Sequence, residues 1–268
     1  MKRTHREESL SFKEKMGRLL ADAGTGKCQV EYRDVFRYFK PKELKEEELD
    51  RLRGDRISMI FQDPLTSLNP VFTIGRQITE SIRVHMGFSR AKADERALSL
   101  LNKVGMPDAK AVMKKYPHML SGGQRQRVMI AMALACNPRL LIADEPTTAL
   151  DVTIQAQIME LIRQLRRELN MSVILITHDI GLVAQMADRV LVMYAGQMIE
   201  QAPVLELFDH PAHPYTKALL RSVPGIMDRR DRVLESIEGM VPEQYDMITG
   251  CRFADRCPYR RDICGWRA

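Results

Sequence analysis

The sequence has no apolar run that approaches the roughly 20 residues needed for a membrane-spanning helix. Its N-terminus is charged and has no apolar stretch of the kind found in a secretory signal peptide. Internal repeats and low-complexity tracts are also missing, which argues against a repeat protein. These absences indicate a globular protein that reaches a membrane only through partners.

The sequence also has few cysteines and no long block of like charge. Two of the five cysteines, Cys28 and Cys136, stand alone, as is usual in a reducing compartment. The net charge is +6, yet positive and negative residues are interspersed in stretches such as Glu43–Arg56. Such a stretch is typical of a solvated face, so we expect no nucleic-acid partner. With 45% hydrophobic residues over 268 positions, the chain can bury the core of one large domain with an appendage.

A complete phosphate loop is missing as well. In that motif a strand leads into Gly-x4-Gly-Lys-Ser/Thr and then into a helix. The nearest match is residues 21–28 (ADAGTGKC), with alanine at the first glycine position and cysteine at the hydroxyl position. Residues 10–20 before it have a helical pattern and residues 29–36 after it alternate like a strand, which is the reverse order. We therefore predict an ordinary turn at Gly24–Lys27.

Two short apolar runs each end in polar residues. Leu140–Ala143 is followed by Asp144 and Glu145, and residues 172–177 are followed by His178. Both runs have the pattern of buried parallel strands, and ligands bind at the carboxyl ends of such strands. One carboxylate there can hold Mg²⁺ at the phosphates of a nucleotide, and a second can orient or deprotonate a water molecule. We assign these roles to Asp144 and Glu145, and a hydrogen bond to the phosphate to His178.

A third feature is the Ser-Gly-Gly segment before the helical pattern of residues 125–135. Ser121, Gly122 and Gly123 offer a hydroxyl and unhindered backbone N–H groups at a helix N-terminus, where the dipole favours an anion. This arrangement predicts a clamp for a γ-phosphate. Taken singly, the three features have other interpretations: a turn, a helix cap and a structural histidine. Their common order and spacing favour the functional one.

Together with Gln62 in the segment MIFQDP and Asp151 after TTAL, these motifs resemble the ABC-type ATPase family. The resemblance implies an α/β fold with a P-loop NTPase-like core, and ATP with Mg²⁺ as its ligands. The catalytic residues that it implies are Glu145, His178 and Gln62. The nucleotide-binding residues that it implies are Ser121, Gly122, Gly123, Gln124 and Asp151, and the residues near the metal are Asp144 and Gln62.

The resemblance divides the chain into four parts. Residues 1–75 correspond to an N-terminally incomplete β and Gln-loop part of the core, since the phosphate-loop portion has no counterpart. Residues 76–120 correspond to a helical subdomain, residues 121–202 to the rest of the core, and residues 203–268 to a C-terminal extension. Apolar stripes of the helical pattern, expected to be buried, are Ile74, Ile78 and Ile82, and Ala97, Leu98, Leu101 and Val104.

The C-terminal extension bears on the substrate. Residues 210–224 (HPAHPYTKALLRSVP) and residues 62–70 (QDPLTSLNP) resemble the ATPases of dipeptide and oligopeptide importers. Nickel and glutathione importers share these features, so the resemblance favours peptides without excluding the other substrates.

Three more cysteines, Cys251, Cys257 and Cys264, are spaced like loop residues near the end of the sequence. Three thiolates can ligate zinc or part of an iron–sulfur cluster, although four thiolates are the usual set for a cluster. The alternative is that all three are free thiols, and the sequence leaves both interpretations open.

Two functions are compatible with the resemblance. In the first, the chain is the ATP-binding subunit that drives uptake of di- and oligopeptides, at the cytoplasmic face of the membrane, with membrane-spanning permease subunits and a homologous ATPase subunit as partners. In the second, it is a silent subunit that completes a partner's ATP site, because residues 21–28 do not form a standard phosphate loop. The same departure leaves open whether the chain itself hydrolyses ATP. A DNA-maintenance ATPase is disfavoured, because no long coiled-coil heptads interrupt the domain.

Overall fold

The computed structural model describes residues 46–148, 150–223, 236–242, 244 and 247–266. The chain falls into two compact units that divide between Ile176 and Thr177. The predicted turn at Gly24–Lys27, with the helix and strand expected beside it, lies outside the described residues. No helix in the described ranges is both long and apolar enough to cross a membrane.

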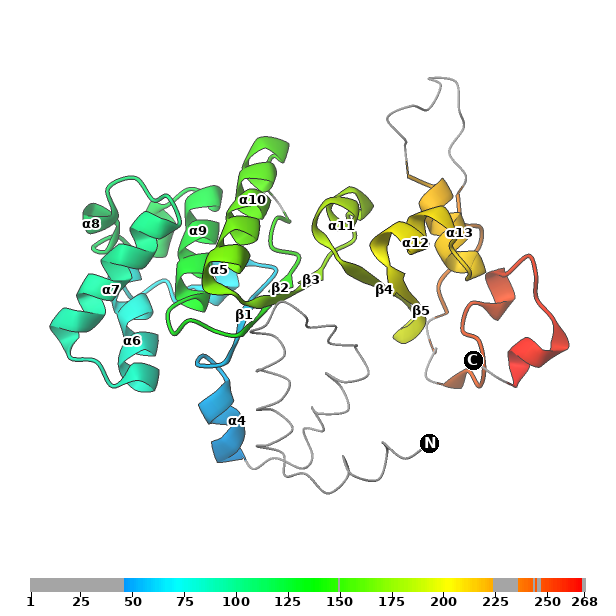
Figure 1. The fold of residues 1–268 in the computed structure, drawn as a ribbon, viewed down its shortest axis with the longest axis horizontal. Helices are drawn as coiled ribbons and strands as arrows, with labels where there is room; N and C mark the ends of the chain where they lie inside the picture. The colour runs from blue at the N-terminus through cyan, green and yellow to red at the C-terminus, as the bar shows by residue number, and fades with distance from the viewer. Residues whose placement is uncertain (1–45, 149, 224–235, 243, 245–246, 267–268) are drawn as a thin grey trace. The chain divides into compact units, whose positions relative to one another are not determined.

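The first unit is built on a parallel three-stranded sheet (Figure 1). Its strands are β1 (Ile57–Ile60), β2 (Leu140–Asp144) and β3 (Ser172–Ile176), with β2 in the middle. The register places Ile60 beside Ala143 and Asp144 beside Ile176. The two strands expected from the apolar runs are therefore confirmed, and their carboxyl ends meet at one edge of the sheet.

The burial of these strands differs from the prediction. Leu141 and Ala143 of β2 are fully buried, but Leu140 and Ile142 are half-buried, and Ile176 at the end of β3 is 47% exposed. Successive side chains of a strand point to opposite faces of the sheet. Within the described part of the chain, only the face of β2 that carries Leu141 and Ala143 is fully buried, so the full burial expected for this strand is not observed there.

The helices of the first unit bury the stripes that their spacing predicts. Ile74, Ile78 and Ile82 are inaccessible to solvent, as are Ala97 and Leu101, whereas Leu98 is half-buried. These helices are α4 (Glu46–Leu52), α5 (Pro64–Ser67), α6 (Ile74–Met86), α7 (Arg90–Lys103), α8 (Ala109–Val112), a 3₁₀ turn (Pro117–Met119), α9 (Gly122–Ala133) and α10 (Val152–Leu169).

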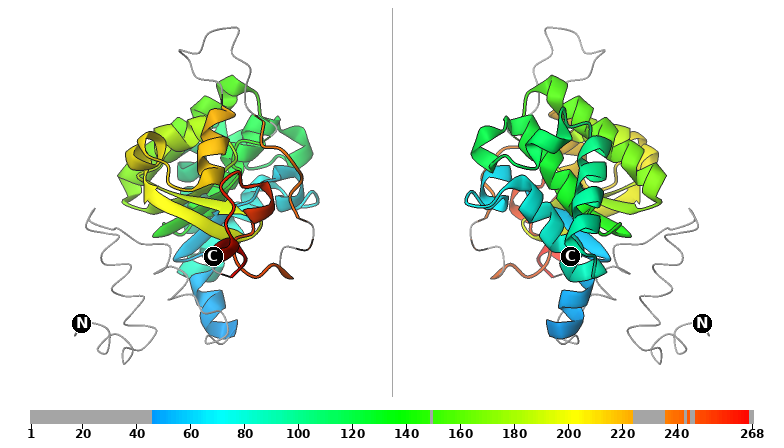
Figure 2. Two further views of the ribbon diagram at one scale, coloured as in Figure 1. Left: turned by 90° about the vertical axis from the view of Figure 1, so that its right-hand side faces the viewer. Right: turned by 90° about the vertical axis from the view of Figure 1, so that its left-hand side faces the viewer.

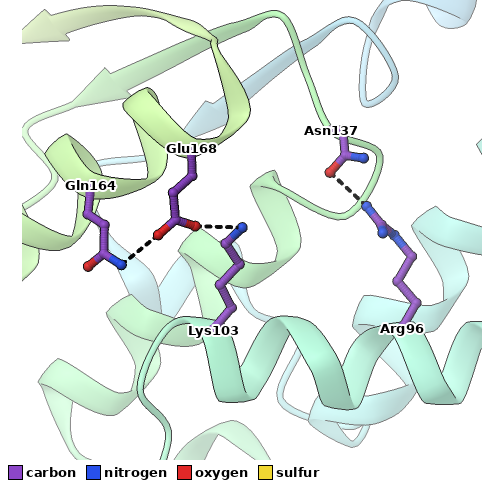
Figure 3. Close-up of polar contacts among 5 residues, drawn as sticks. All are labelled: Arg96, Lys103, Asn137, Gln164 and Glu168. Carbon is purple, nitrogen blue, oxygen red and sulfur yellow. Dashed lines mark hydrogen bonds and ion pairs between the residues drawn. The ribbon is translucent and has the colours of Figure 1, made fainter.

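Polar contacts join α7 to the rest of the first unit (Figure 3). Lys103 Nζ lies 2.8 Å from Glu168 Oε2 on α10, and Gln164 Nε2 donates to Glu168 Oε1 at 2.6 Å. From the middle of α7, Arg96 donates to the side chain of Asn137, just beyond α9, at 2.8 Å. These contacts hold α7 against both α10 and the segment that follows α9.

The second unit contains a β-hairpin with short helices beside it (Figures 1 and 2). The hairpin turn has positive φ at both central residues, Ala195 (46°) and Gly196 (74°), as the two-residue turns that suit strand twist require. The apolar run RVLVMY at residues 189–194, followed by Ala-Gly, is the sequence pattern that such a strand and turn leave. The elements are α11 (Ile180–Met186), β4 (Arg189–Tyr194), β5 (Gln197–Pro203), α12 (Val204–Asp209), α13 (Pro214–Arg221) and 3₁₀ turns at Ala254–Arg256 and Asp262–Gly265.

An aromatic cluster forms the core of this unit. Phe253 is 1% exposed, and its ring centroid lies 5.2 Å from that of Tyr194 and 5.4 Å from that of Tyr215. Arg256 donates to the Tyr194 hydroxyl at 3.1 Å. The segment that carries Phe253 and Arg256 is thereby fixed to the hairpin and to α13.

Acid pH is expected to destabilise the second unit in two steps. Burial lowers the pKa of His213 below its ordinary 6.5. The folded unit therefore has its full stability with respect to this group above pH 6.5, and its free energy of unfolding decreases as the pH drops toward the folded pKa. Burial acts to raise the pKa of Glu200, but hydrogen bonds from Thr216 and from the amides of Ala212 and His213 lower it below 4.5 overall. Its contribution is full above pH 4.5 and is lost as the pH falls through the depressed folded pKa.

Near-UV circular dichroism of Tyr194 and Tyr215, which pack against Phe253, reports the unfolding of this unit. His213→Asn should remove the step below pH 6.5, because asparagine has no group that titrates there. Asparagine can still cap α13 by accepting the hydrogen bond that the Tyr215 amide donates to the imidazole Nδ1. A melting temperature that stays constant between pH 7.5 and pH 5.5 in the native protein would contradict this expectation.

Candidate functional site

The carboxyl edge of the parallel sheet brings together three of the residues predicted from the sequence. Gln62 follows β1, Asp144 ends β2, and Glu145 comes directly after it. The Gln62 side-chain amide donates to Glu145 Oε2 at 2.8 Å, although the two residues are far apart in the sequence. Strand order and register alone position this pair, because both strands end at the same edge.

Glu145 has a backbone conformation that is uncommon for its residue type. Its φ is 43°, in the left-handed region, and its amide donates to the Ile176 carbonyl at 2.9 Å. Its side-chain Oε2 also accepts a hydrogen bond from Thr148 Oγ1 at 2.8 Å. Such strain persists where the surroundings fix it, and it is frequent at functional sites. Thr148 belongs to the TTAL segment before Asp151, but no role was predicted for its hydroxyl.

Ser121 and Gln124 form a reciprocal cap at the N-terminus of α9. Ser121 Oγ accepts from the Gln124 amide at 3.4 Å, and Gln124 Oε1 accepts from the Ser121 amide at 3.1 Å. The pattern Ser-x-x-Gln is the sequence signature of this capping box, and it could have revealed the structural role of both residues. The cap fixes the start of the helix at which an anion clamp is predicted.

The N-termini of α9 and α10 lie side by side. Asp151 caps α10, since its Oδ1 accepts from the Ile154 amide at 3.0 Å. A Cβ atom on Gly123 would lie 2.9 Å from Ile154 Cγ2. Gly123 therefore allows a close approach that any other residue would obstruct, which is a structural reason for this glycine in addition to the predicted one.

Gly123→Ala is expected to destabilise the first unit by about 1–3 kcal/mol, because a methyl group must fit where the contact is already too short. Gly122→Ala is the matched control, since its nearest foreign atom, Leu150 Cδ2, would be 3.6 Å away, an ordinary contact. Chemical denaturation of the two variants measures the difference. Equal stabilities of the two variants would show that α9 and α10 move apart to make room for the methyl group with no loss of stability.

His178 and the C-terminal cysteines lie in the second unit. His178 precedes α11, whose cap is Asp179. The Cys251 amide donates to the Cys264 carbonyl at 2.9 Å, and Cys251 Sγ lies 4.0 Å from His213 Nε2. A search of the described part of the chain finds no group of three or more His, Cys, Asp or Glu side chains that could hold a metal ion. The predicted zinc or iron–sulfur site at Cys251, Cys257 and Cys264 is therefore not supported, because a metal needs ligands that converge on one point.

Comparison with known proteins finds matches to two families. The ABC transporter family matches residues 20–148, and the family described as oligopeptide/dipeptide transporter, C-terminal region, matches residues 199–264. A putative peptide import ATP-binding protein of Brucella melitensis is 54% identical over 226 residues, which cover 82% of this chain and 67% of the relative. The chain belongs to the ABC transporter ATP-binding family. The oligopeptide transport ATP-binding protein AppD of Bacillus subtilis is 56% identical over 219 residues.

This ABC transporter chain spans 66% of the length of AppD, a little under two thirds. Among solved structures it resembles the dimeric ABC transporter cassette MJ0796, with 32% identity and a TM-score of 0.54 over 60% of this chain and 68% of the cassette. The expected P-loop NTPase-like fold is confirmed. Members of the family bind ATP with Mg²⁺, and MJ0796 has also been solved with ADP and phosphate.

Proposed function

We propose that this chain is the ATP-hydrolysing, energy-coupling subunit of an ABC importer for peptides. The observation that carries the proposal is the hydrogen bond between Gln62 and Glu145 at the carboxyl edge of a parallel sheet, beside Asp144. A carboxylate in that place can orient and deprotonate a water molecule that attacks the terminal phosphate. Glu145 is accordingly the proposed general base.

The residues at this edge fit a bound Mg²⁺. The Asp144 carboxylate and the Gln62 amide oxygen are the hard oxygen ligands that this ion prefers. Mg²⁺ supplies charge neutralisation at the outer phosphates when it is bound with ATP. Within the chain, Asp144 would bind the Mg²⁺, and His178 is the proposed hydrogen-bond donor to the phosphate.

The start of α9 is proposed to act on the nucleotide of a second ATPase subunit. Ser121, Gly122 and Gly123 would face the γ-phosphate there, with Gln124 and Asp151 shaping the surface beside them. The twelve-residue length of α9 and its capping box support this role, because a fixed helix N-terminus attracts an anion.

Peptides are the proposed cargo. The support is the match of residues 199–264 to the oligopeptide/dipeptide transporter C-terminal region, together with a relative named for peptide import at 54% identity and one named for oligopeptide transport at 56%. The proposed partners are membrane-spanning permease subunits and a homologous ATPase subunit. The proposed location is the cytoplasmic face of the membrane, where these partners would hold the chain.

The test is ATP hydrolysis by the purified complex of this chain, its permease subunits and its partner ATPase subunit, with and without peptides presented by a binding protein. We expect peptides, and not Ni²⁺ or glutathione, to stimulate hydrolysis. Full hydrolysis in a complex in which only this chain carries Glu145→Gln would favour the alternative function, a silent subunit that completes its partner's site. Failure of this chain to assemble with permease subunits would contradict both functions.

A further inference from the structure

The turn after β2 holds a residue that contacts the proposed base. Thr148 Oγ1 and Gln62 Nε2 both donate to Glu145 Oε2, each at 2.8 Å. The two donors come from different parts of the first unit. Thr148 belongs to the same turn as Glu145, whereas Gln62 lies in the segment between β1 and α5.

The turn from Glu145 to Thr148 is stiff. The Thr148 amide donates to the Glu145 carbonyl at 3.1 Å, and the ring of Pro146 fixes one backbone angle between them. Pro146 and Thr147 are buried, so the turn is also held by packing. The Glu145 amide is bonded to Ile176 of the neighbouring strand. These restraints come from the turn itself and from β3, so the contact between Thr148 and Glu145 does not depend on a bond to Gln62.

We propose that Thr148 is a positioning residue that keeps the Glu145 carboxylate oriented, and that Gln62 is an exchangeable second donor to the same oxygen. The inference rests on the proposed function, in which Glu145 is the general base. A base must stay within hydrogen-bond reach of the water that it activates, and small losses of orientation lower the rate. Thr148 meets this need because its hydroxyl donates to Glu145 Oε2 from within the same turn.

The experiment compares Thr148→Val, which replaces the hydroxyl with a methyl group, and Thr148→Ser, which retains it, in the assembled importer complex. We expect Thr148→Val to lower kcat by about tenfold, the effect of one lost hydrogen bond to a charged group, with KM for ATP changed by less than about twofold. Thr148→Ser should restore most of the rate. Ser99→Ala, at an exposed position of α7, is the control for loss of a hydroxyl away from the site.

A second measurement does not depend on activity. In chemical denaturation of the isolated chain, Thr148→Val and Glu145→Leu each remove the same hydrogen bond, so the double variant should be more stable than additivity predicts. An unchanged kcat in Thr148→Val, a failure of Thr148→Ser to restore it, or additive stabilities would each overturn the inference. A wild-type complex that hydrolyses no ATP would instead refute the proposed function, and with it the role for which Thr148 is proposed.

Discussion

Glu145→Gln is expected to lower ATP hydrolysis by the assembled importer by roughly 100- to 10,000-fold, the usual contribution of a positioned general base. The variant is well matched to the site. The glutamine Oε1 can still accept the hydrogen bonds from Gln62 and Thr148 that the carboxylate accepts at 2.8 Å. The loss should therefore come from the missing base rather than from a disturbed fold. The loss is measured as phosphate release by a purified complex that carries Glu145→Gln in this chain and the corresponding substitution in the partner ATPase subunit.

Two controls make this result specific. Glu160→Gln, at an exposed position of α10 where Glu160 pairs with Arg163, makes the same chemical change on the surface and should leave the rate within about twofold. Binding of labelled ATP to the Glu145→Gln complex should persist, because the base is not required for nucleotide affinity. Hydrolysis that survives Glu145→Gln would mean that another group activates the water.

Ser121→Arg is expected to suppress hydrolysis in the mixed complex by about 100-fold or more, comparable with the loss of a hydrogen-bond donor at a reacting centre. The arginine would extend from the N-terminus of α9 into the space that the proposed function gives to the partner's γ-phosphate. The variant also removes the capping box with Gln124, which costs about 1 kcal/mol of stability by itself.

Ser121→Ala separates these two effects, because it removes the same cap without added bulk. We expect Ser121→Ala to lose the same stability as Ser121→Arg while retaining much more activity. The measurement is the ATPase rate of complexes whose assembly has been verified by size-exclusion chromatography. Equal activity of the two variants, at whatever level, would show that bulk at this position does not reach a nucleotide.

The parts of the fold that were predictable are those in which local pattern and tertiary packing agree. The apolar run at residues 140–143 is short enough to favour a strand that delivers Asp144 and Glu145 to its end, and the isoleucines spaced by four residues in α6 favour a helix that faces a core. Ala195 and Gly196 form the turn between β4 and β5, and both have the positive φ values that this turn needs.

The parts that could not be predicted depend on contacts between distant segments. The bond from Gln62 to Glu145 requires the strand order, and the hydroxyl of Thr148 has meaning only once the turn after β2 has its shape. Phe253 packs on Tyr194 and Tyr215 across long stretches of sequence, which no periodicity records. The cysteine spacing indicated a possible metal site, but spacing cannot show whether thiols converge, and among the described residues they do not.

The most direct test of the proposed function is transport itself. Inverted vesicles or liposomes that contain the purified importer would be loaded with a peptide-binding protein and labelled peptide, and Mg-ATP would be added on the side that carries this chain. The proposed function predicts ATP-dependent release of peptide toward that side, lost in Glu145→Gln and reduced in Thr148→Val. Transport that requires ATP but is unchanged in Glu145→Gln, or transport of another solute with no effect of peptides, would contradict it.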